Sequence, residues 1–187
     1  MRLSAPRITP LNEKDCSAET RESLGKAADS GRVYNIFRTV ARHPKLLKRW
    51  LPFANHVLVK SALPARDHEI LTLRTGWLCR SEYEFAQHVV IGRRAGLIDA
   101  DIQRIVDGPD APGWDPFEAT LARAADELRR DAFVSEPTWK TLAARYSNEQ
   151  LMDTVFTVGE YNLVSMALNS LGVQLDPGLE GFSRWRG

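Results

Sequence analysis

Apolar residues recur along this chain at the spacing of α-helices. In residues 35–42, for example, Ile36, Phe37 and Val40 share one helical face. Proline or capping residues begin several further segments, and glycine or a polar loop ends them. The predicted helices cover residues 17–28, 35–42, 44–60, 64–78, 81–95, 99–106, 115–131, 135–145 and 147–171. No stretch alternates apolar and polar residues for long enough to predict a sheet. We therefore expect an all-α fold of about eight or nine helices.

Two local patterns say more about individual helices. The segment 64–78 is apolar almost all the way round, so we expect it to be deeply buried. Ser81 with Glu84, and Ser147 with Gln150, have the spacing of capping boxes, in which two side chains satisfy the first backbone N–H groups of a helix. Both pairs predict helix starts.

Length and composition narrow the class of protein. A chain of 187 residues favours one domain, here with an N-terminal extension of about residues 1–34 and a tail of about 173–187. The 25 Lys and Arg residues nearly balance the 24 Asp and Glu residues, which argues against nucleic acid as a partner. A targeting segment and a membrane-spanning apolar run are both missing from the sequence, so we expect a cytoplasmic protein with no membrane partner.

Residues 63–98 read LPARDHEILTLRTGWLCRSEYEFAQHVVIGRRAGLI. An LP-x4-E helix start at 63–69, followed by His88 and a basic run at 93–97, resembles the carboxymuconolactone decarboxylase and AhpD-like alkylhydroperoxidase superfamily. The similarity extends over about residues 35–175 and implies an AhpD-like helical bundle. It also implies a homo-oligomer, as a dimer, trimer or hexamer.

The peroxidase branch of that superfamily has the pattern Glu-x11-Cys-x2-Cys-x3-His. Counted back from His88, the pattern places Glu84 and Ser81 at the two cysteine positions and Glu69 at the glutamate position. Glu84 instead matches the decarboxylase branch, which has a glutamate four residues before the histidine. A serine cannot form the disulfide on which CxxC peroxidase chemistry depends, so we expect little activity of that kind.

An acid–base site is the remaining prediction. On a helix Ser81, Glu84 and His88 share a stripe about 60° wide, and an ionised Glu84 raises the pKa of His88. Glu69 can face His88 if its helix packs alongside. The resemblance implies decarboxylation or lactone chemistry, without a cofactor, on a small organic acid from aromatic breakdown. In that reading His88 is the acid, Glu84 orients it, and Glu69 is a second base or relay.

The sequence offers several candidates for the residues that contact the substrate. Ser81 can donate a hydrogen bond to the substrate, and Arg66, Arg74 or Arg80 can neutralise a carboxylate. The sequence does not choose among the three arginines, and Arg80 is named with Ser81 as the substrate-binding pair. Structural alternatives stay open for each site residue. Glu84 can simply close the capping box, Glu69 can pair with an arginine, and His88 can be an ordinary buried histidine.

Two further hypotheses compete with the decarboxylase. One is a peroxidase relative that uses Cys79 with an external thiol. Cys79 lies two positions before Ser81, which occupies the first cysteine position of the peroxidase pattern, and on a continuous helix this displacement is about 200°. The other is a non-catalytic helical oligomer with a decayed site. The chain has only two cysteines, and no His, Cys, Asp or Glu set has a compelling metal spacing, so we predict no metal site.

Overall fold

The computed structural model describes residues 2–28 and 31–185 and has nine α-helices and no β-strand within them. The prediction of an all-α fold is confirmed. The helices are α1 (Ala18–Lys26), α2 (Asn35–Val40), α3 (Pro44–Asn55), α4 (Ala65–Leu78), α5 (Glu82–Arg94), α6 (Asp99–Asp107), α7 (Pro116–Asp131), α8 (Glu136–Ala143) and α9 (Asn148–Leu171). A π-helical turn (His56–Lys60) follows α3, and short 3-10 helices cover Glu13–Asp15 and Phe182–Arg184.

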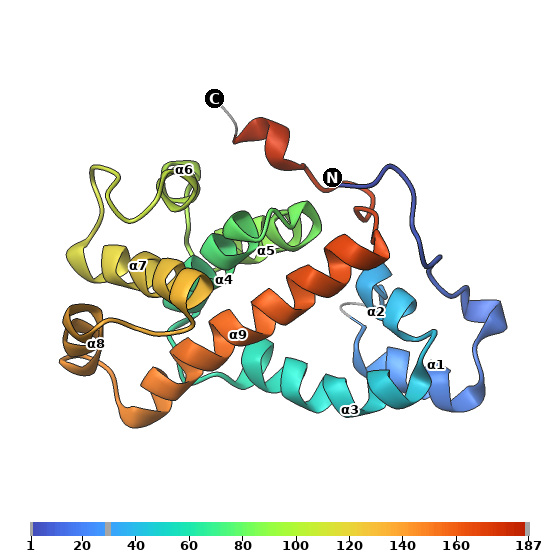
Figure 1. Ribbon diagram of the computed structural model, residues 1–187. Coiled ribbons are helices and arrows are strands. Elements are labelled where there is room, and N and C mark those ends of the chain that lie inside the picture. The colour runs from blue at the N-terminus through green and yellow to red at the C-terminus, as the bar shows by residue number, and fades with distance from the viewer. Residues whose placement is uncertain (1, 29–30, 186–187) are drawn as a thin grey trace.

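The central element is α4, which packs against α5, α6, α7 and α9. Figure 1 shows the long α9 crossing the molecule next to α4 and α5, with α6 to α8 on one side and α1 to α3 on the other. Every residue of α4 from 67 to 76 is buried, which confirms the expected burial of this segment. Polar side chains on α4 must therefore find their partners inside the protein.

Two glycines allow α4 and α5 to approach each other closely. A Cβ atom on Gly92 of α5 would lie 2.9 Å from Cδ1 of Leu97 and 3.3 Å from Cδ1 of Leu73, which is on α4. A Cβ atom on Gly76 of α4 would lie 3.4 Å from the backbone N of Phe85 at the start of α5. The Cβ atom on Gly92 would also lie 3.7 Å from Cβ of Glu69, so the close approach at Gly92 places the Glu69 side chain within reach of α5.

The two predicted capping boxes have different outcomes. Ser147 and Gln150 form the predicted box at the start of α9. Ser81 does precede α5, but its side chain makes no capping hydrogen bond, so this second prediction is wrong. The side chain of Glu84 is turned instead toward His88, because a buried carboxylate is stabilised more by an imidazolium than by a backbone N–H.

Both ends of the described chain pack onto the helical core. The backbone N–H groups of Arg7 and Ile8 donate to the carbonyl of Leu171 at the end of α9. Phe182 and Trp185, from the segment predicted to be a tail, are buried against Phe85 of α5. In the part of the chain described, no helix has both the length and the apolar composition needed to cross a membrane.

Candidate active site

The contact between α4 and α5 joins the two ends of the predicted motif. Nδ1 of His88 lies 2.8 Å from Oε2 of Glu69, and Nε2 of His88 lies 3.1 Å from Oε1 of Glu84. Each of these three residues is at most 4% exposed. The predicted approach of Glu69 to His88 is therefore observed, and both ring nitrogens of His88 face carboxylates.

A second histidine belongs to the same cluster, and the sequence analysis missed it. Nδ1 of His68 lies 3.0 Å from Oε1 of Glu69, so one carboxylate contacts two imidazoles. His68 precedes Glu69 directly in the sequence. Successive residues of a helix point about 100° apart, so no periodic pattern indicates that they share a site.

The charges of the cluster shift the pKa values of its members in opposite directions. Burial alone would raise the pKa of Glu69, but the charge of His88 and hydrogen bonds from both histidines lower it to about 2. Burial would likewise lower the pKa of His88, but the charges and hydrogen bonds of Glu69 and Glu84 raise it to about 10. Near neutral pH the pair is a buried carboxylate and imidazolium, in which Glu69 accepts from both histidines.

Helix α9 closes the cluster from the side opposite α4 and α5. The ring of Tyr161 stands edge-on to His88, with centroids 4.8 Å apart, and to His68, at 5.8 Å. Burial and the charges of Glu84 and Glu69 hold the pKa of Tyr161 well above its ordinary range, so it stays a neutral phenol.

Glu160 is a further buried carboxylate on α9 that the sequence analysis did not single out. Its Oε1 accepts a hydrogen bond from Nε1 of Trp50 at 2.5 Å, and burial raises its pKa. The two residues are 110 positions apart, so this pair was beyond the reach of a local pattern. Glu160 adds a second acidic group near Glu84, whose charge also raises the Glu160 pKa.

The arginines near the motif have structural partners or face solvent. Arg66 binds Glu118 and Asp101, and Arg74 binds Asp126 together with two backbone carbonyls of the α6 end. Neither contacts Glu69, so the alternative of a Glu69–arginine pair is wrong. It fails because the two histidines already take both oxygens of Glu69.

The two predicted substrate-binding residues lie at the turn between α4 and α5. Arg80 is exposed there with a φ of +50°. Ser81 is fully buried, and its Oγ has no hydrogen-bond partner. A substrate role for either residue stays a prediction.

Cys79 caps the C-terminal end of α4 and is not part of α5. The break between the predicted helices 64–78 and 81–95 is confirmed, and the angle for a continuous helix does not apply because the chain turns between Cys79 and Ser81. The thiol donates to Oδ1 of Asn162 on α9 at 3.0 Å. Among the hydrogen bonds of the described residues, none joins Cys79 to Glu69, Glu84 or His88. The thiol thus faces an amide oxygen rather than a base or a cation.

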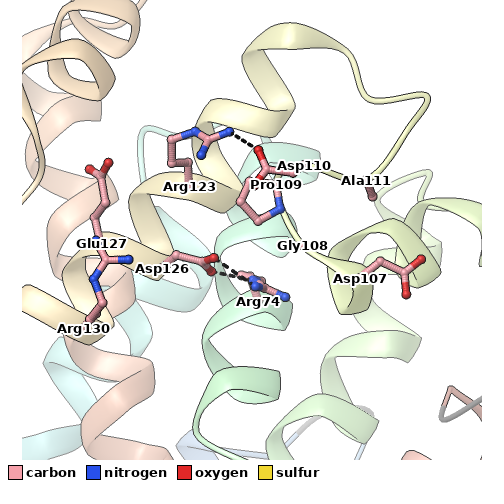
Figure 2. Close-up of a pocket in the computed structure, with 10 residues that line it drawn as sticks. All are labelled: Arg74, Asp107, Gly108, Pro109, Asp110, Ala111, Arg123, Asp126, Glu127 and Arg130. Atoms are coloured by element: carbon pink, nitrogen blue, oxygen red, sulfur yellow. Dashed lines mark hydrogen bonds and ion pairs between the residues drawn. The ribbon is translucent and has the colours of Figure 1, made fainter.

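A cavity of about 520 Å³ lies away from this cluster, between the loop after α6 and helix α7. Figure 2 shows two of the arginines that line it paired with acidic side chains, Arg74 with Asp126 and Arg123 with Asp110. The third, Arg130, pairs with Asp131. Because these charges are paired, the cavity has little free positive charge for an anion. In residues 2–28 and 31–185, no group of three or more His, Cys, Asp or Glu side chains could hold a metal ion.

Comparison with solved structures places the fold. An uncharacterized peroxidase-related protein from Ralstonia eutropha JMP134, described as an alkylhydroperoxidase AhpD core, is 16% identical with a TM-score of 0.79, covering 91% of this chain and 92% of its own. A peroxidase-related protein from Silicibacter sp. TM1040 is 15% identical with a TM-score of 0.74, covering 99% and 95%. The debrominase Bmp8, as a Cys-to-Ala variant in complex with 2,3,4-tribromopyrrole, is 12% identical with a TM-score of 0.77, covering 93% and 94%.

Sequence comparison gives a more specific result for part of the chain. No curated protein matches this sequence significantly. The sequence model of the carboxymuconolactone decarboxylase family matches residues 44–127, which run from α3 into α7 and include Glu69, Glu84 and His88. The carboxymuconolactone decarboxylase family is therefore what this segment resembles in sequence, and the segment lies within an AhpD-like helical fold.

Proposed function

We propose that this protein is an acid–base enzyme that needs no cofactor and carries out decarboxylation or lyase chemistry on a small organic acid or lactone from aromatic breakdown. The observation that carries the proposal is the buried row of Glu69, His88 and Glu84, with contacts of 2.8 and 3.1 Å. A protonated imidazole between two carboxylates holds a proton that it can transfer to either carboxylate, and it can therefore act as an acid. The family match is consistent with this class of reaction.

We propose a path for the proton that is consistent with this geometry. When a substrate loses CO₂, the electron pair of the broken C–C bond stays behind as an enolate, and the enolate carbon must then gain a proton. Both nitrogens of His88 face carboxylates, so His88 reaches the substrate through Glu84. In this proposal Nε2 of His88 gives its proton to Glu84, Glu84 passes it to carbon, and the charge of Glu69 favours reprotonation of His88.

The test is turnover by purified variants. We expect the wild type to consume a carboxymuconolactone, or a related lactone acid from a small panel, with release of CO₂. His88→Ala should abolish turnover, and Glu84→Gln, which retains the Glu69–His88 pair, should lower it at least about 100-fold. His56→Ala, at an exposed histidine bound to Asp153, is the matched control. Full activity in His88→Ala, or no turnover of any panel member by the wild type, would contradict the proposal.

The outer face of α9 supports a second proposal, that the enzyme is a homo-oligomer. Met152, Phe156, Leu163 and Met166 are 51–60% exposed, and with Gly159 they follow the alternating four and three spacing of a helix–helix seam. The only charged residue in 154–171 is Glu160, which is buried. An uncharged apolar stripe suits a second copy of itself better than a charged partner.

Light scattering after gel filtration tests the oligomer. Leu163→Glu places a charge in the centre of the stripe and should give monomers, whereas the surface control Lys45→Glu on α3 should keep the wild-type mass. A monomeric wild type would exclude this proposal without affecting the proposed chemistry.

A further inference from the structure

The two histidines of the cluster differ in what their ring nitrogens contact. His88 has a carboxylate at each nitrogen. His68 has Glu69 at Nδ1 only, and its Nε2 is buried with no hydrogen-bond partner. Buried polar atoms without a partner are rare in folded proteins because they lose hydration and gain nothing in return. Nε2 of His68 is thus the imidazole nitrogen of this cluster that is open to a further group.

The orientation of Glu69 determines which nitrogen of His68 carries the proton. Glu69 is ionised and can only accept, so Nδ1 of His68 donates to it. A neutral His68 then has its lone pair at Nε2. His88 already places an imidazolium 2.8 Å from the other oxygen of Glu69, and a second cation on His68 would put like charges on both sides of one carboxylate. The neutral ring with a free Nε2 is the form that the contacts favour.

We infer that His68 is the base of the site, and that its Nε2 takes a proton from an acidic C–H or O–H group of a small polar ligand. The inference rests on the proposed acid–base function. It assigns the acid step and the base step of that function to two different imidazoles. His88 supplies a proton through Glu84, and His68 removes one. Glu69 holds both rings in place and stabilises the positive charge that each carries in turn.

Other buried polar groups on α9 also lack a hydrogen-bond partner and could bond to a polar ligand or to water bound with it. Oγ of Ser165, Oγ1 of Thr157 and Oε2 of Glu160 are buried without partners. Thr157 and Ser165 lie one turn before and one turn after Tyr161, whose ring contacts His68, so they share its face of the helix. His68 itself contacts Glu69 from α4 and the ring of Tyr161 from α9. His88 and Glu84 from α5 join the cluster through Glu69, and the charges of Glu84, Glu69 and Glu160 act on Tyr161.

The proposed step balances as a simple proton transfer. The ligand C–H or O–H bond breaks, and its electron pair stays on the ligand as an enolate or alkoxide. A new N–H bond forms at Nε2 of His68, while the Nδ1–H bond to Glu69 is retained. The imidazolium later returns this proton to the product or to water, which restores the neutral ring.

The substitution His68→Asn separates this role from a structural one. The asparagine amide can still donate an N–H to Glu69 from the position of Nδ1, but nothing replaces Nε2. If His68 only holds Glu69 in place, the variant should keep turnover. If His68 is the base, turnover should fall at least about 100-fold. His56→Asn is the matched control.

Nitrogen-15 NMR of the histidines tests the inference without a substrate. In the wild type near neutral pH, we expect His68 to be protonated at Nδ1 and unprotonated at Nε2, and His88 to be protonated at both nitrogens. A His68 ring that is protonated at Nε2 at this pH would overturn the inference, as would wild-type turnover in His68→Asn. Loss of turnover in His88→Ala with full turnover in His68→Asn would reject the role of His68 alone and leave the proposed function standing.

Discussion

The substitution Glu69→Gln tests the central claim that a buried carboxylate keeps His88 protonated. The amide has nearly the shape of the carboxylate, so packing between α4 and α5 is preserved and only the charge is lost. The partners of Glu69 are two imidazoles, at 2.8 and 3.0 Å. Without the negative charge, burial should dominate, and the pKa of His88 should fall from about 10 toward its ordinary value.

The size of the effect follows from the pKa values. Raising the pKa of His88 from 6.5 to about 10 corresponds to roughly 5 kcal/mol of stability at most. Breaking one partner of a buried ion pair typically costs about 3–5 kcal/mol, which agrees with this upper bound. We therefore expect Glu69→Gln to lower the free energy of unfolding by about 3–5 kcal/mol near pH 6.

The stabilisation by the Glu69–His88 pair depends on pH, and the direction of each pKa shift determines where it is lost. Because folding raises the pKa of His88, the stabilisation is complete below pH 6.5 and is lost as the pH rises through about 10. Because folding lowers the pKa of Glu69, the same interaction is complete above pH 4.5 and is lost as the pH falls through about 2. The difference between wild type and variant should therefore be largest between pH 4.5 and 6.5.

Urea unfolding of both proteins at pH 6 and pH 9.5, with an NMR titration of His88, measures these quantities. Glu127→Gln is a suitable control, since Glu127 accepts hydrogen bonds from Ser135 and Thr138 and has no imidazole partner. Its cost should be similar at both pH values. Equal costs of Glu69→Gln at pH 6 and pH 9.5, or an unchanged His88 titration, would refute the reasoning.

Three further predictions concern the surroundings of the site. Gly92→Ala should cost about 1–3 kcal/mol in urea unfolding, because the new Cβ would lie 2.9 Å from Cδ1 of Leu97 and 3.3 Å from Cδ1 of Leu73 on α4; wild-type stability would show that these two side chains can shift at no cost. Cys79→Ser should keep turnover within about twofold, and peroxide should yield no sulfenic acid at Cys79 by mass spectrometry; a trapped sulfenic acid would favour the peroxidase hypothesis. Tyr146→Phe should destabilise the protein by about 1–3 kcal/mol, because it removes the 2.5 Å hydrogen bond to buried Asp67; an unchanged melting temperature would mean that this bond contributes little.

The sequence by itself determined the helices and the spacing of the motif. Helix positions depend on periodicity and on start and stop signals within a few residues, so nearly all of the predicted segments match observed helices. The positions of Glu84 and His88, four residues apart, needed only the geometry of one helix. Where a local signal competed with a distant partner, as for Ser81 and Glu84, the local signal was misleading.

Tertiary structure alone decided which groups complete the site. The pairing of Glu69 with His88 depends on the close approach of α4 and α5 beside Gly92, and that approach joins residues 19 positions apart. The contacts of Tyr161 with His68 and His88 depend on how α9 crosses both helices. The thiol of Cys79 faces Asn162 because the chain turns directly after α4. Such contacts are set by packing between helices, which leaves no periodic trace in the sequence of any one helix.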